Sequence, residues 1–376
     1  MKITIDGRAA NWYRGTGIGT YTYQLINSIN QIDFYNKYNI YISKNSKLDL
    51  KLKKNFNVLY SNQDVINNFW QDVAMPTKIN EDSTEIYHIP QNGIGTNFSV
   101  NTKKVITLHD IIPLKLPETV SDNYLKTFNN QISSILNNID GIITVSNYSK
   151  LDICKNLNFP EEKIFVTHLA AEEQYVPLDK TYCKDFIKNN YNIVDDYILY
   201  VGGFSPRKNI LGLIEAFSLA KNKINKNLKL IILGTKGKSF EIYKKRTEEL
   251  KIKNDVLFPG FIKTEHMPIF YSSALMLVYP SFYEGFGLPP IEAMASGTPV
   301  IASNLTSIPE VVGDAAVLIN PYNQEDISET IEKVALCPEL RKDLIRKGLS
   351  QCALFNWKQT AFETINVYEK LILSHS

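Results

Sequence analysis

Two successive arrays of short apolar runs limit the fold of this chain more than any other feature. The runs are rich in β-branched residues and bounded by turn residues, and longer amphipathic stretches lie between them. Such runs are typical of buried parallel strands, although a single run cannot be told from a buried helix segment. Together they predict an α/β protein with two doubly wound parallel sheets. The first array is KITID, YNIYIS, NFNVLYS, EIYHIP, KVITLHD, GIITVS and KIFVTH, and the second is YILYVGG, LKLIILG, DVLFPGF, LMLVYPS, PVIASN and AAVLIN.

The length of the chain agrees with two domains, and its net charge argues against one class of function, nucleic-acid binding. A chain of 376 residues is too long for one ordinary core. A polar stretch around residues 178–196 separates the two arrays and is the candidate linker. The net charge of +2 supplies no whole-domain basic excess, so we expect no nucleic-acid partner.

Several features predict a cytoplasmic chain. The sequence opens with MKITIDG, which reads as a first strand with no signal segment before it. The longest apolar runs are far shorter than the roughly 20 residues that cross a bilayer. Four cysteines lie far apart without a C-x-x-C pair, as expected for reduced thiols. The basic run 47–54 (KLDLKLKK) is either a solvated face or a patch for a membrane surface or an acidic ligand.

The stretch 201–210, VGGFSPRKNI, reads as a strand end, a turn and the first turn of a helix. Ser205 suits the N-cap, and Pro206 suits the first helical position. Arg207 and Lys208 then lie beside the positive end of the helix dipole, where cations are unfavourable. An anion such as a diphosphate would make this arrangement favourable. The alternative is two basic side chains that bend into solvent.

A second candidate site lies in residues 282–303, FYEGFGLPPIEAMASGTPVIAS. Pro289 and Pro290 predict a helix that starts after Glu284 and holds Glu292 in its first turn or so. The glycines of the loop allow its backbone to approach a ligand closely. For Glu292, simple stabilisation of the helix dipole is an alternative.

Glu284 and Glu292 form an E-x7-E motif, and its context closely resembles the donor-site signature of the retaining glycosyltransferases of family 4, a group 1 family with the GT-B fold. The resemblance implies two Rossmann-like domains that face a central cleft. It implies an N-terminal acceptor-binding domain at 1–185 and a donor-binding domain at 195–355, with the last helix, 356–376, packed back on the first domain. The resemblance also rests on GTGIGTYTYQL (15–25), VITLHDIIP (105–113), VSNYSK (145–150), VGGFSPRKNI and FNWKQTAFETINVYEKL.

The resemblance implies a role for each donor-site residue. Glu284 would bind hydroxyls of the donor sugar, and Glu292 would hold the ribose through two adjacent hydroxyls. Arg207 and Lys208 would clamp the diphosphate and stabilise the leaving group. Many relatives carry an arginine where this chain has Gly203, so the clamp here rests on the two later cations. Three backbone N–H groups would complete the cradle, those of Phe286, Gly287 and Leu288.

The first domain offers weaker candidates. Gly15, Gly17 and Gly19 would form a loop between strand and helix that closes on the donor, although they do not make a full dinucleotide fingerprint. His109 ends a strand and would contact the sugar or stabilise the transition state. Asp110 would orient the acceptor or shape the turn. Two further acceptor candidates lie in YHIPQNG, His88 and Gln91.

The expected reaction needs no metal and no bound cofactor. The sequence has no D-x-D pair, no H-E-x-x-H and no Cys/His cluster. Positive side chains and helix ends would therefore neutralise the leaving diphosphate, and the nucleotide diphosphate sugar is a co-substrate.

We predict a retaining enzyme that transfers a hexose to a hydroxyl of a glycan or lipid-linked acceptor in surface polysaccharide or glycoconjugate synthesis. The stretch LHDIIPLKLPE resembles bacterial enzymes of this kind, and GDP-mannose is the favoured donor. Scattered lysines with interleaved Leu and Phe also predict that the enzyme contacts the inner face of the membrane as a peripheral protein. Two alternatives remain: another enzyme on this scaffold, such as an epimerase or a phosphorylase, and a non-catalytic partner subunit that binds sugar or peptide.

Overall fold

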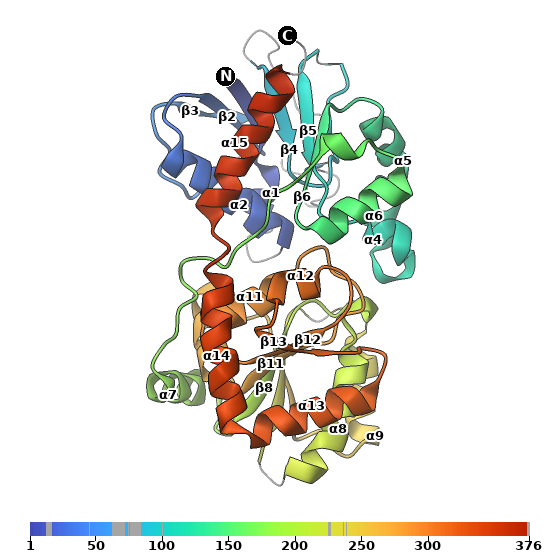
Figure 1. Ribbon diagram of the computed structural model, residues 1–376, viewed down its shortest axis with the longest axis vertical. Coiled ribbons are helices and arrows are strands. Elements are labelled where there is room, and N and C mark those ends of the chain that lie inside the picture. Colours follow the sequence, from blue (N-terminus) through green and yellow to red (C-terminus); the bar gives the residue numbers. More distant parts are fainter. Residues whose placement is uncertain are drawn as a thin grey trace. The chain divides into compact units, whose positions relative to one another are not determined.

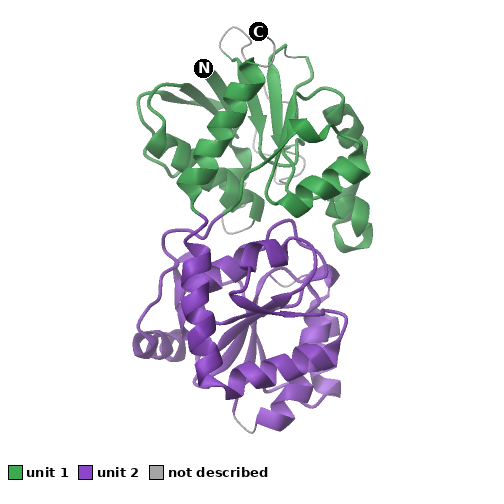
Figure 2. Ribbon diagram, viewed as in Figure 1, with its two compact units in different colours: residues 1–169, 356–376 green, residues 170–355 purple. Residues whose placement is uncertain are grey.

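The computed structural model describes residues 1–12, 17–44, 46–61, 72–73, 75, 84–99, 101–224, 227–235, 237 and 239–373. The chain divides into two compact units (Figure 2). Unit 1 contains residues 1–169 and 356–376, and unit 2 contains residues 170–355.

The described part of unit 1 contains a seven-stranded parallel sheet in the order β3-β2-β1-β4-β5-β6-β7 (Figure 1). Strands β2 and β4 lie on either side of β1, where Ile5 pairs with both Ile40 and His88. The strand order therefore reverses between β1 and β4, which makes this the topological switch point of the sheet. The strands are β1 (Lys2–Asp6), β2 (Lys37–Ile42), β3 (Phe56–Tyr60), β4 (Ile86–Ile89), β5 (Lys103–Thr107), β6 (Gly141–Thr144) and β7 (Ile164–Val166).

Helices cover both faces of this sheet, so all four residues of β4 are buried. Tyr87 and Ile89 belong to a core that includes Phe128 of α5. His88 lies on the opposite face, where its side chain bonds to Tyr368 of α15. The helices are α1 (Arg8–Trp12), α2 (Gly17–Ile32), α4 (Ile112–Lys115), α5 (Asp122–Leu136), α6 (Asn147–Leu157) and α15 (Trp357–Leu373), with 3-10 turns η2 (Pro117–Thr119) and η3 (Glu161–Lys163).

Unit 2 repeats the pattern with a sheet in the order β10-β9-β8-β11-β12-β13, six parallel strands among the residues described. Its switch point lies between β8 and β11, where Leu199 pairs with Leu277. The strands are β8 (Tyr197–Val201), β9 (Lys229–Leu233), β10 (Val256–Gly260), β11 (Met276–Tyr279), β12 (Val300–Ser303) and β13 (Ala316–Ile319).

In the helical layers of unit 2, α8 packs on α13 and α11 on α14 (Figure 1), and α7 packs on α10. These helices bury apolar faces such as Leu213, Ile214 and Phe217 of α8. The helices are α7 (Lys180–Tyr191), α8 (Ile210–Ile224), α9 (Phe240–Glu249), α10 (Met267–Ser273), α11 (Leu288–Ala295), α12 (Ile308–Val312), α13 (Gln324–Leu336) and α14 (Pro338–Cys352), with 3-10 turns η4 (Pro206–Lys208) and η5 (Thr264–His266).

The two predicted parallel sheets are confirmed, and each predicted apolar run overlaps one of the strands. The predicted boundary near residues 185–195 is wrong, because the division falls after Leu169. The polar stretch is the solvated side of α7, which packs on α10, and Tyr191 hydrogen-bonds to His266 (2.6 Å). Residues 356–376 belong to unit 1, where α15 packs on α2.

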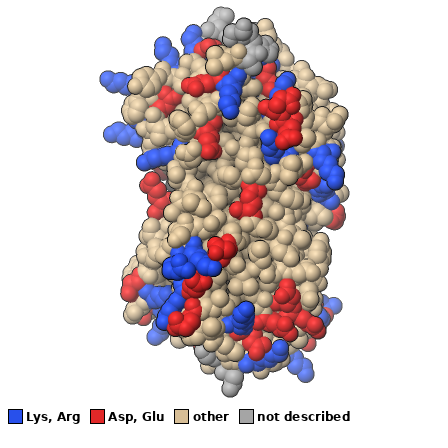
Figure 3. Space-filling model, viewed as in Figure 1, with Lys and Arg blue, Asp and Glu red and all other residues tan. Residues whose placement is uncertain are grey.

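The described surface carries no strong field of one sign on the face in view. Figure 3 shows Lys and Arg interspersed with Asp and Glu over both units, in keeping with the net charge of +2. Within the described ranges, no helix has both the length and the apolar character needed to cross a membrane.

Candidate functional site

Two loops meet at the switch point of unit 2. The chain leaves β8 through η4, which carries Arg207 and Lys208, and it leaves β11 through the loop with Glu284. The backbone N–H of Phe282 donates to the Arg207 carbonyl (2.8 Å), so the loops are joined directly. The carboxyl ends of neighbouring strands at a switch point are where open α/β sheets bind ligands.

One carboxylate and two cations form the centre of this site. Lys208 Nζ donates to Glu284 Oε1 (2.6 Å) and to the Tyr279 hydroxyl (2.7 Å). Arg207 Nη1 donates to Glu284 Oε2 (3.2 Å) and to the Tyr283 carbonyl (3.0 Å). Lys208 and Glu284 are buried, whereas the Arg207 side chain keeps 18% of its surface exposed. The alternative of two basic side chains bent into solvent is therefore wrong.

The electrostatics of the cluster favour an anion. Burial alone would raise the pKa of Glu284, but the charges of Lys208 and Arg207 outweigh it and lower this pKa to about 2. Glu284 is thus ionised at neutral pH. Two cations beside one carboxylate leave a net charge of +1 on these three side chains.

The backbone around the two cations differs from the prediction. Ser205 and Pro206 begin the 3-10 turn η4, without a side-chain cap from Ser205. Asn209 then adopts a left-handed conformation (φ 55°), and α8 begins only at Ile210. The predicted helix start is wrong because this left-handed residue separates the turn from α8. The charges of Arg207 and Lys208 are held against Glu284 instead of against a helix dipole.

The loop after Glu284 is fixed by its own hydrogen bonds and by a required glycine. Ser307 Oγ donates to the carbonyls of Glu284 (2.9 Å) and Phe286 (3.0 Å). Gly287 has φ 107°, and a Cβ there would lie 2.6 Å from Ile308 Cδ1. Among the described residues, the N–H groups of Gly287 and Leu288 have no hydrogen-bond partner. They remain available as donors at the start of α11.

Glu292 lies in a different electrostatic environment. It is in the second turn of α11 rather than the first, so the dipole alternative does not account for it. Its Oε2 accepts from the Tyr271 hydroxyl (2.7 Å). Burial raises the pKa of Glu292 to about 7, while hydrogen bonds from Tyr271 and Tyr175 act in the opposite direction. The two carboxylates of the motif therefore differ: one is firmly ionised, and the other titrates near neutral pH.

Gly203 lies at an open position. It is exposed, and an added Cβ would meet no atom within 4 Å. The space for a longer side chain exists here, although this chain does not fill it.

In unit 1, His109 follows β5 and is buried. Its backbone N–H donates to Asn92 Oδ1 (3.0 Å), and its ring Nε2 bonds to the Pro90 carbonyl (3.1 Å). The ring meets Tyr21 edge-on, with centroids 4.8 Å apart. Burial lowers the pKa of His109 to about 4, so the ring is neutral at pH 7. Asp110 Oδ1 accepts from the N–H of Ile112 (3.0 Å), a bond that shapes the start of α4.

The acceptor role predicted for His88 and Gln91 is corrected by their burial, because both side chains are 0% exposed. The ring of His88 lies between the hydroxyls of Tyr368 (2.7 Å) and Thr107 (2.8 Å). Gln91 Nε2 donates to Asp6 Oδ2 (2.6 Å). A bound acceptor cannot reach either side chain without opening the core of unit 1.

The predicted glycine loop is also placed differently. Gly17 and Gly19 lie in the first turn of α2, with Gly17 exposed and Gly19 buried. Gly15 lies outside the described residues. The two described glycines therefore belong to the helix rather than to the loop before it.

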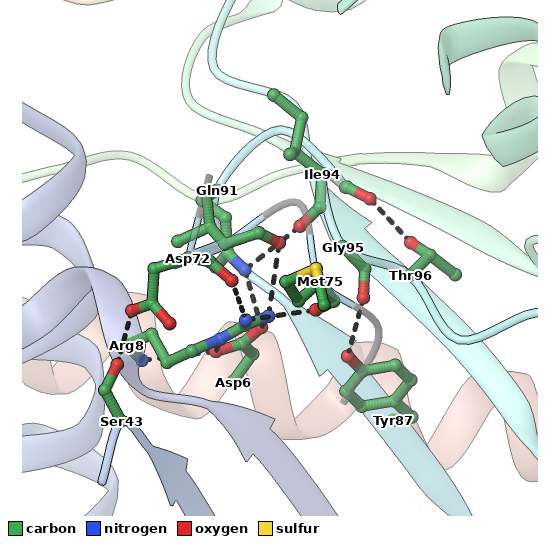
Figure 4. Close-up of polar contacts among 12 residues, drawn as sticks. Asp6, Arg8, Ser43, Asp72, Met75, Tyr87, Gln91, Ile94, Gly95 and Thr96 are labelled. Atoms are coloured by element: carbon green, nitrogen blue, oxygen red, sulfur yellow. Dashed lines mark hydrogen bonds and ion pairs between the residues drawn. The ribbon is translucent and has the colours of Figure 1, made fainter. Parts of the chain in front are cut away.

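One pair of charged residues was missed by the sequence reasoning. Asp6 and Arg8 form an ion pair (2.7 Å) at the switch point of unit 1, and both are almost fully buried. Figure 4 shows Arg8 surrounded by carboxylate and carbonyl oxygens. The available signal was the sequence DGR, which begins at the last residue of the first strand.

Within the part of the chain that the structure describes, no group of three or more His, Cys, Asp or Glu side chains is arranged to hold a metal ion. At the candidate site of unit 2, the positive charges of Arg207 and Lys208 lie beside the negative charge of Glu284.

Similar proteins point to one family. The family model described as Glycosyl transferases group 1 matches residues 184–351. The chain is 33% identical over 289 residues to the O-antigen chain mannosyltransferase B of Escherichia coli, a match that covers 76% of this chain and 74% of that protein.

Two solved structures have the same fold. The sucrose-phosphate synthase of Thermosynechococcus elongatus matches with a TM-score of 0.76 at 19% identity and covers 99% of both chains. Anabaena Alr3699/HepE, solved in complex with UDP and glucose, matches with a TM-score of 0.75 at 15% identity and covers 98% of this chain and 100% of that one. Both likenesses show the GT-B fold.

Proposed function

The chain belongs to the group 1 glycosyltransferases and acts in surface polysaccharide synthesis, and from this premise we propose that it transfers mannose from GDP-mannose with retention at the anomeric carbon. The acceptor is a hydroxyl of a growing glycan, carried on a lipid. The observation that supports the donor site is the cluster of Arg207, Lys208 and Glu284 at the switch point of unit 2.

In this proposal the cluster binds the two ends of the scissile bond. Arg207 and Lys208 bind the diphosphate, and the N–H groups of Gly287 and Leu288 add neutral donors. The positive charge of Arg207 and Lys208 stabilises the negative charge that develops on the leaving group. Such electrostatic stabilisation usually contributes most to the rate of this kind of step. Glu284, ionised and held rigidly, accepts hydrogen bonds from hydroxyls of the sugar.

Glu292 holds the ribose of the nucleotide. A carboxylate can accept from two adjacent hydroxyls at once. Because its pKa is about 7, the carboxylate form that binds best grows as the pH rises through neutrality. Donor affinity therefore increases with pH over this range.

The reaction exchanges one bond to the anomeric carbon for another on the same face. The bond to the diphosphate oxygen breaks as the acceptor oxygen bonds to the anomeric carbon, and the departing phosphate takes the acceptor proton. His109, neutral and buried, stabilises the sugar and does not serve as the base. Side chains neutralise the diphosphate, so the proposed reaction needs no metal.

The acceptor domain of the proposed enzyme is unit 1, and one of its surfaces suits the inner face of a membrane. Phe34 and Tyr35 are 64% and 93% exposed, and Lys53 Nζ lies 3.5 Å from the Phe34 ring centre. Lys51 and Lys54 are exposed, and neither forms an ion pair with a described residue. Aromatic rings with lysines match the interface of an anionic bilayer.

The membrane surface is tested by co-sedimentation with vesicles. Wild type should bind vesicles that contain phosphatidylglycerol and should release them as salt rises. Lys51→Glu with Lys54→Glu should weaken this binding, whereas Lys342→Glu in unit 2 is the matched control. Equal binding to neutral vesicles of phosphatidylcholine would contradict the proposal.

The donor is tested first by thermal unfolding with GDP, UDP, dTDP or ADP, without added metal and then with Mg²⁺. At about a hundred times its dissociation constant, a bound nucleotide adds roughly 2.7 kcal/mol of stability. We expect a shift with GDP alone, followed by transfer from GDP-mannose to a lipid-linked acceptor. A shift with UDP alone would replace the donor, and nucleotide cleavage without transfer would favour the other enzymes of this scaffold.

A further inference from the structure

We infer that the buried ion pair of Asp6 and Arg8 positions His109, acting through Gln91 and the turn formed by residues 90–96. The inference deepens the proposed function and rests on it only for the sugar that His109 contacts. Asp6, Arg8 and Gln91 are positioning residues in this scheme, because none of them is exposed enough to touch a substrate.

Topology brings the parts of this device together. Asp6 ends β1, Gln91 follows β4, and His109 follows β5, and these three strands are consecutive in the sheet. Their carboxyl ends therefore lie side by side at the switch point of unit 1. This is the position that corresponds to the Arg207, Lys208 and Glu284 cluster of unit 2.

The ion pair anchors a separate segment of the chain. Arg8 donates to both carboxylate oxygens of Asp6, from Nε (3.0 Å) and from Nη2 (2.7 Å). Its other bonds go to main-chain carbonyls, as Figure 4 shows. Burial alone would lower the pKa of Arg8, but Asp6 raises it, so the guanidinium stays charged. The carbonyls are those of Asp72, Val73 (3.2 Å) and Met75 (3.0 Å).

Gln91 links this pair to the turn 90–96. Its Nε2 donates to Asp6 Oδ2 (2.6 Å) and to the Ile94 carbonyl (3.2 Å), both visible in Figure 4. Both partners can only accept, so the orientation of the amide is fixed. Its Oε1 is buried with no hydrogen-bond partner among the described residues. Burying this oxygen without a partner is unfavourable, so we infer that Gln91 serves as a specific hydrogen-bonding link and not only as a packing residue of the core.

The turn itself packs closely against the residues around the ion pair. Gly95 has φ 86°, and a Cβ there would lie 1.8 Å from the Val73 carbonyl oxygen and 2.9 Å from Arg8 Nη2. Asn92 has φ 56°, and its Nδ2 donates to the Tyr124 hydroxyl (2.7 Å). The turn is thus packed on one side against the segment that Arg8 holds and tied on the other to α5.

His109 donates two hydrogen bonds to this turn, and the one from its ring sets the tautomer. Asn92 Oδ1 accepts from the backbone N–H of His109, and the Pro90 carbonyl lies 3.1 Å from Nε2. A carbonyl cannot donate, so Nε2 carries the ring proton. With the ring neutral, Nδ1 holds a lone pair, and it has no partner among the described residues. His109 can therefore accept a hydrogen bond from a sugar hydroxyl through Nδ1.

The decisive experiment reads the tautomer directly, by ¹⁵N NMR of the imidazole nitrogens at pH 7 in the full-length protein. The chain has five histidines, so His109→Gln assigns the signal of His109. Wild type should show a protonated Nε2 and an unprotonated Nδ1. A protonated Nδ1 would overturn the inference without any variant of the network.

Gln91→Met then breaks the link, and we expect the two ring nitrogens to move toward the averaged shifts of exchanging tautomers. Turnover of GDP-mannose should fall about ten- to a hundred-fold in kcat, with the donor KM changed less than about two-fold. Gln131→Met is the matched control, because Gln131 Oε1 accepts from Gly95 in the same turn but has no link to Asp6.

The two readouts separate the inference from the proposed function. If the ring shifts change in Gln91→Met but neither wild type nor any variant turns over GDP-mannose, the positioning of His109 is supported and the proposed donor is rejected. Unchanged shifts and kcat in a folded Gln91→Met would overturn the positioning, as would equal effects of Gln131→Met.

Discussion

The two units have the same kind of sheet, and each places an arginine and a carboxylate at its switch point, but the two arrangements differ. In unit 1, Asp6 and Arg8 balance in charge and are almost wholly buried. In unit 2, Arg207 and Lys208 face Glu284 with a surplus of one positive charge, and Arg207 is partly exposed. The same topology thus yields one site satisfied by its own chain and one with charge left for a ligand.

The difference lies in what covers each strand end. In unit 1 the carboxylate of Asp6 and the carbonyls of Asp72, Val73 and Met75 take up the donors of Arg8, and Gln91 of the turn 90–96 donates to Asp6. In unit 2 the corresponding loops leave Gly203 open and the N–H groups of Gly287 and Leu288 without partners among the described residues. A switch point becomes a binding site only where the chain leaves such groups accessible.

The largest effect should come from breaking the balanced pair. Arg8→Met leaves the Asp6 carboxylate buried without its cationic partner, which should lower the free energy of unfolding by about 3–5 kcal/mol. All three tryptophans lie within unit 1, so urea unfolding followed by tryptophan fluorescence reports on this unit. The double variant Asp6→Asn with Arg8→Met should recover much of the lost stability. A loss below about 1 kcal/mol in Arg8→Met alone would show that the two units do not differ in this way.

The same kind of change in unit 2 should reduce catalysis instead. Arg207→Ala leaves Glu284 paired with Lys208, so stability should change little. We expect kcat to fall about 10²–10³-fold, because a positive charge that stabilises the leaving group is lost. Arg246→Ala is the control, since Arg246 bonds to Glu215 and Glu249 away from this cluster. Turnover within about three-fold of wild type would show that Arg207 has no catalytic part.

The two carboxylates of unit 2 should give opposite dependences of stability on pH. The pKa of Glu292 is about 7 in the folded chain against an ordinary 4.5, so the folded state binds more protons between these values. Its contribution to stability is full below about 4.5 and is lost as the pH rises through about 7. Glu292→Gln should remove this loss, by at most about 3 kcal/mol, in calorimetric unfolding at several pH values.

Glu284 behaves in the reverse sense and serves as the comparison. Its pKa of about 2 lies below 4.5, so its contribution is present above 4.5 and lost as the pH falls toward 2. Glu284→Gln should therefore lower stability at neutral pH. An unchanged slope near neutral pH in Glu292→Gln would show that the Glu292 carboxyl titrates at its ordinary value.

The smallest effect should come from Gly203→Ala, for which Gly95→Ala in unit 1 is the comparison. Gly203→Ala adds a methyl group where no atom lies within 4 Å, so its stability should stay within about 0.5 kcal/mol of wild type. Gly95→Ala in unit 1 meets the Val73 carbonyl and a positive φ, and should cost at least about 1–3 kcal/mol. Equal tolerance at both positions, measured by thermal unfolding, would mean that the two strand ends are equally open.

The fold could be predicted from the sequence because its signals are local. Each strand is a short apolar run, and Pro289 and Pro290 mark the start of α11 after Glu284. The boundary could not be predicted in the same way, since a polar stretch describes a solvated helix as well as a linker. Only the packing of α7 on α10 assigns that stretch to unit 2.

The residue types of the candidate site could be predicted more readily than their surroundings. The sequence singled out Arg207, Lys208 and Glu284, but not that they contact one another. Burial of His88 depends on α15, whose Tyr368 follows His88 by 280 residues in the sequence. Such pairings join distant segments, and a pattern read along one segment does not encode them.

Unit 1 is built from two segments that lie on either side of unit 2 in the sequence, and this has a consequence for biosynthesis. During translation all of unit 2 is synthesised before residues 356–376 are made. The contacts of His88 with Tyr368 and of Tyr21 with Trp357 can form only after α15 has been made. Unit 1 therefore completes its core last, and a nascent chain that stops before α15 would expose the face of the sheet that this helix covers.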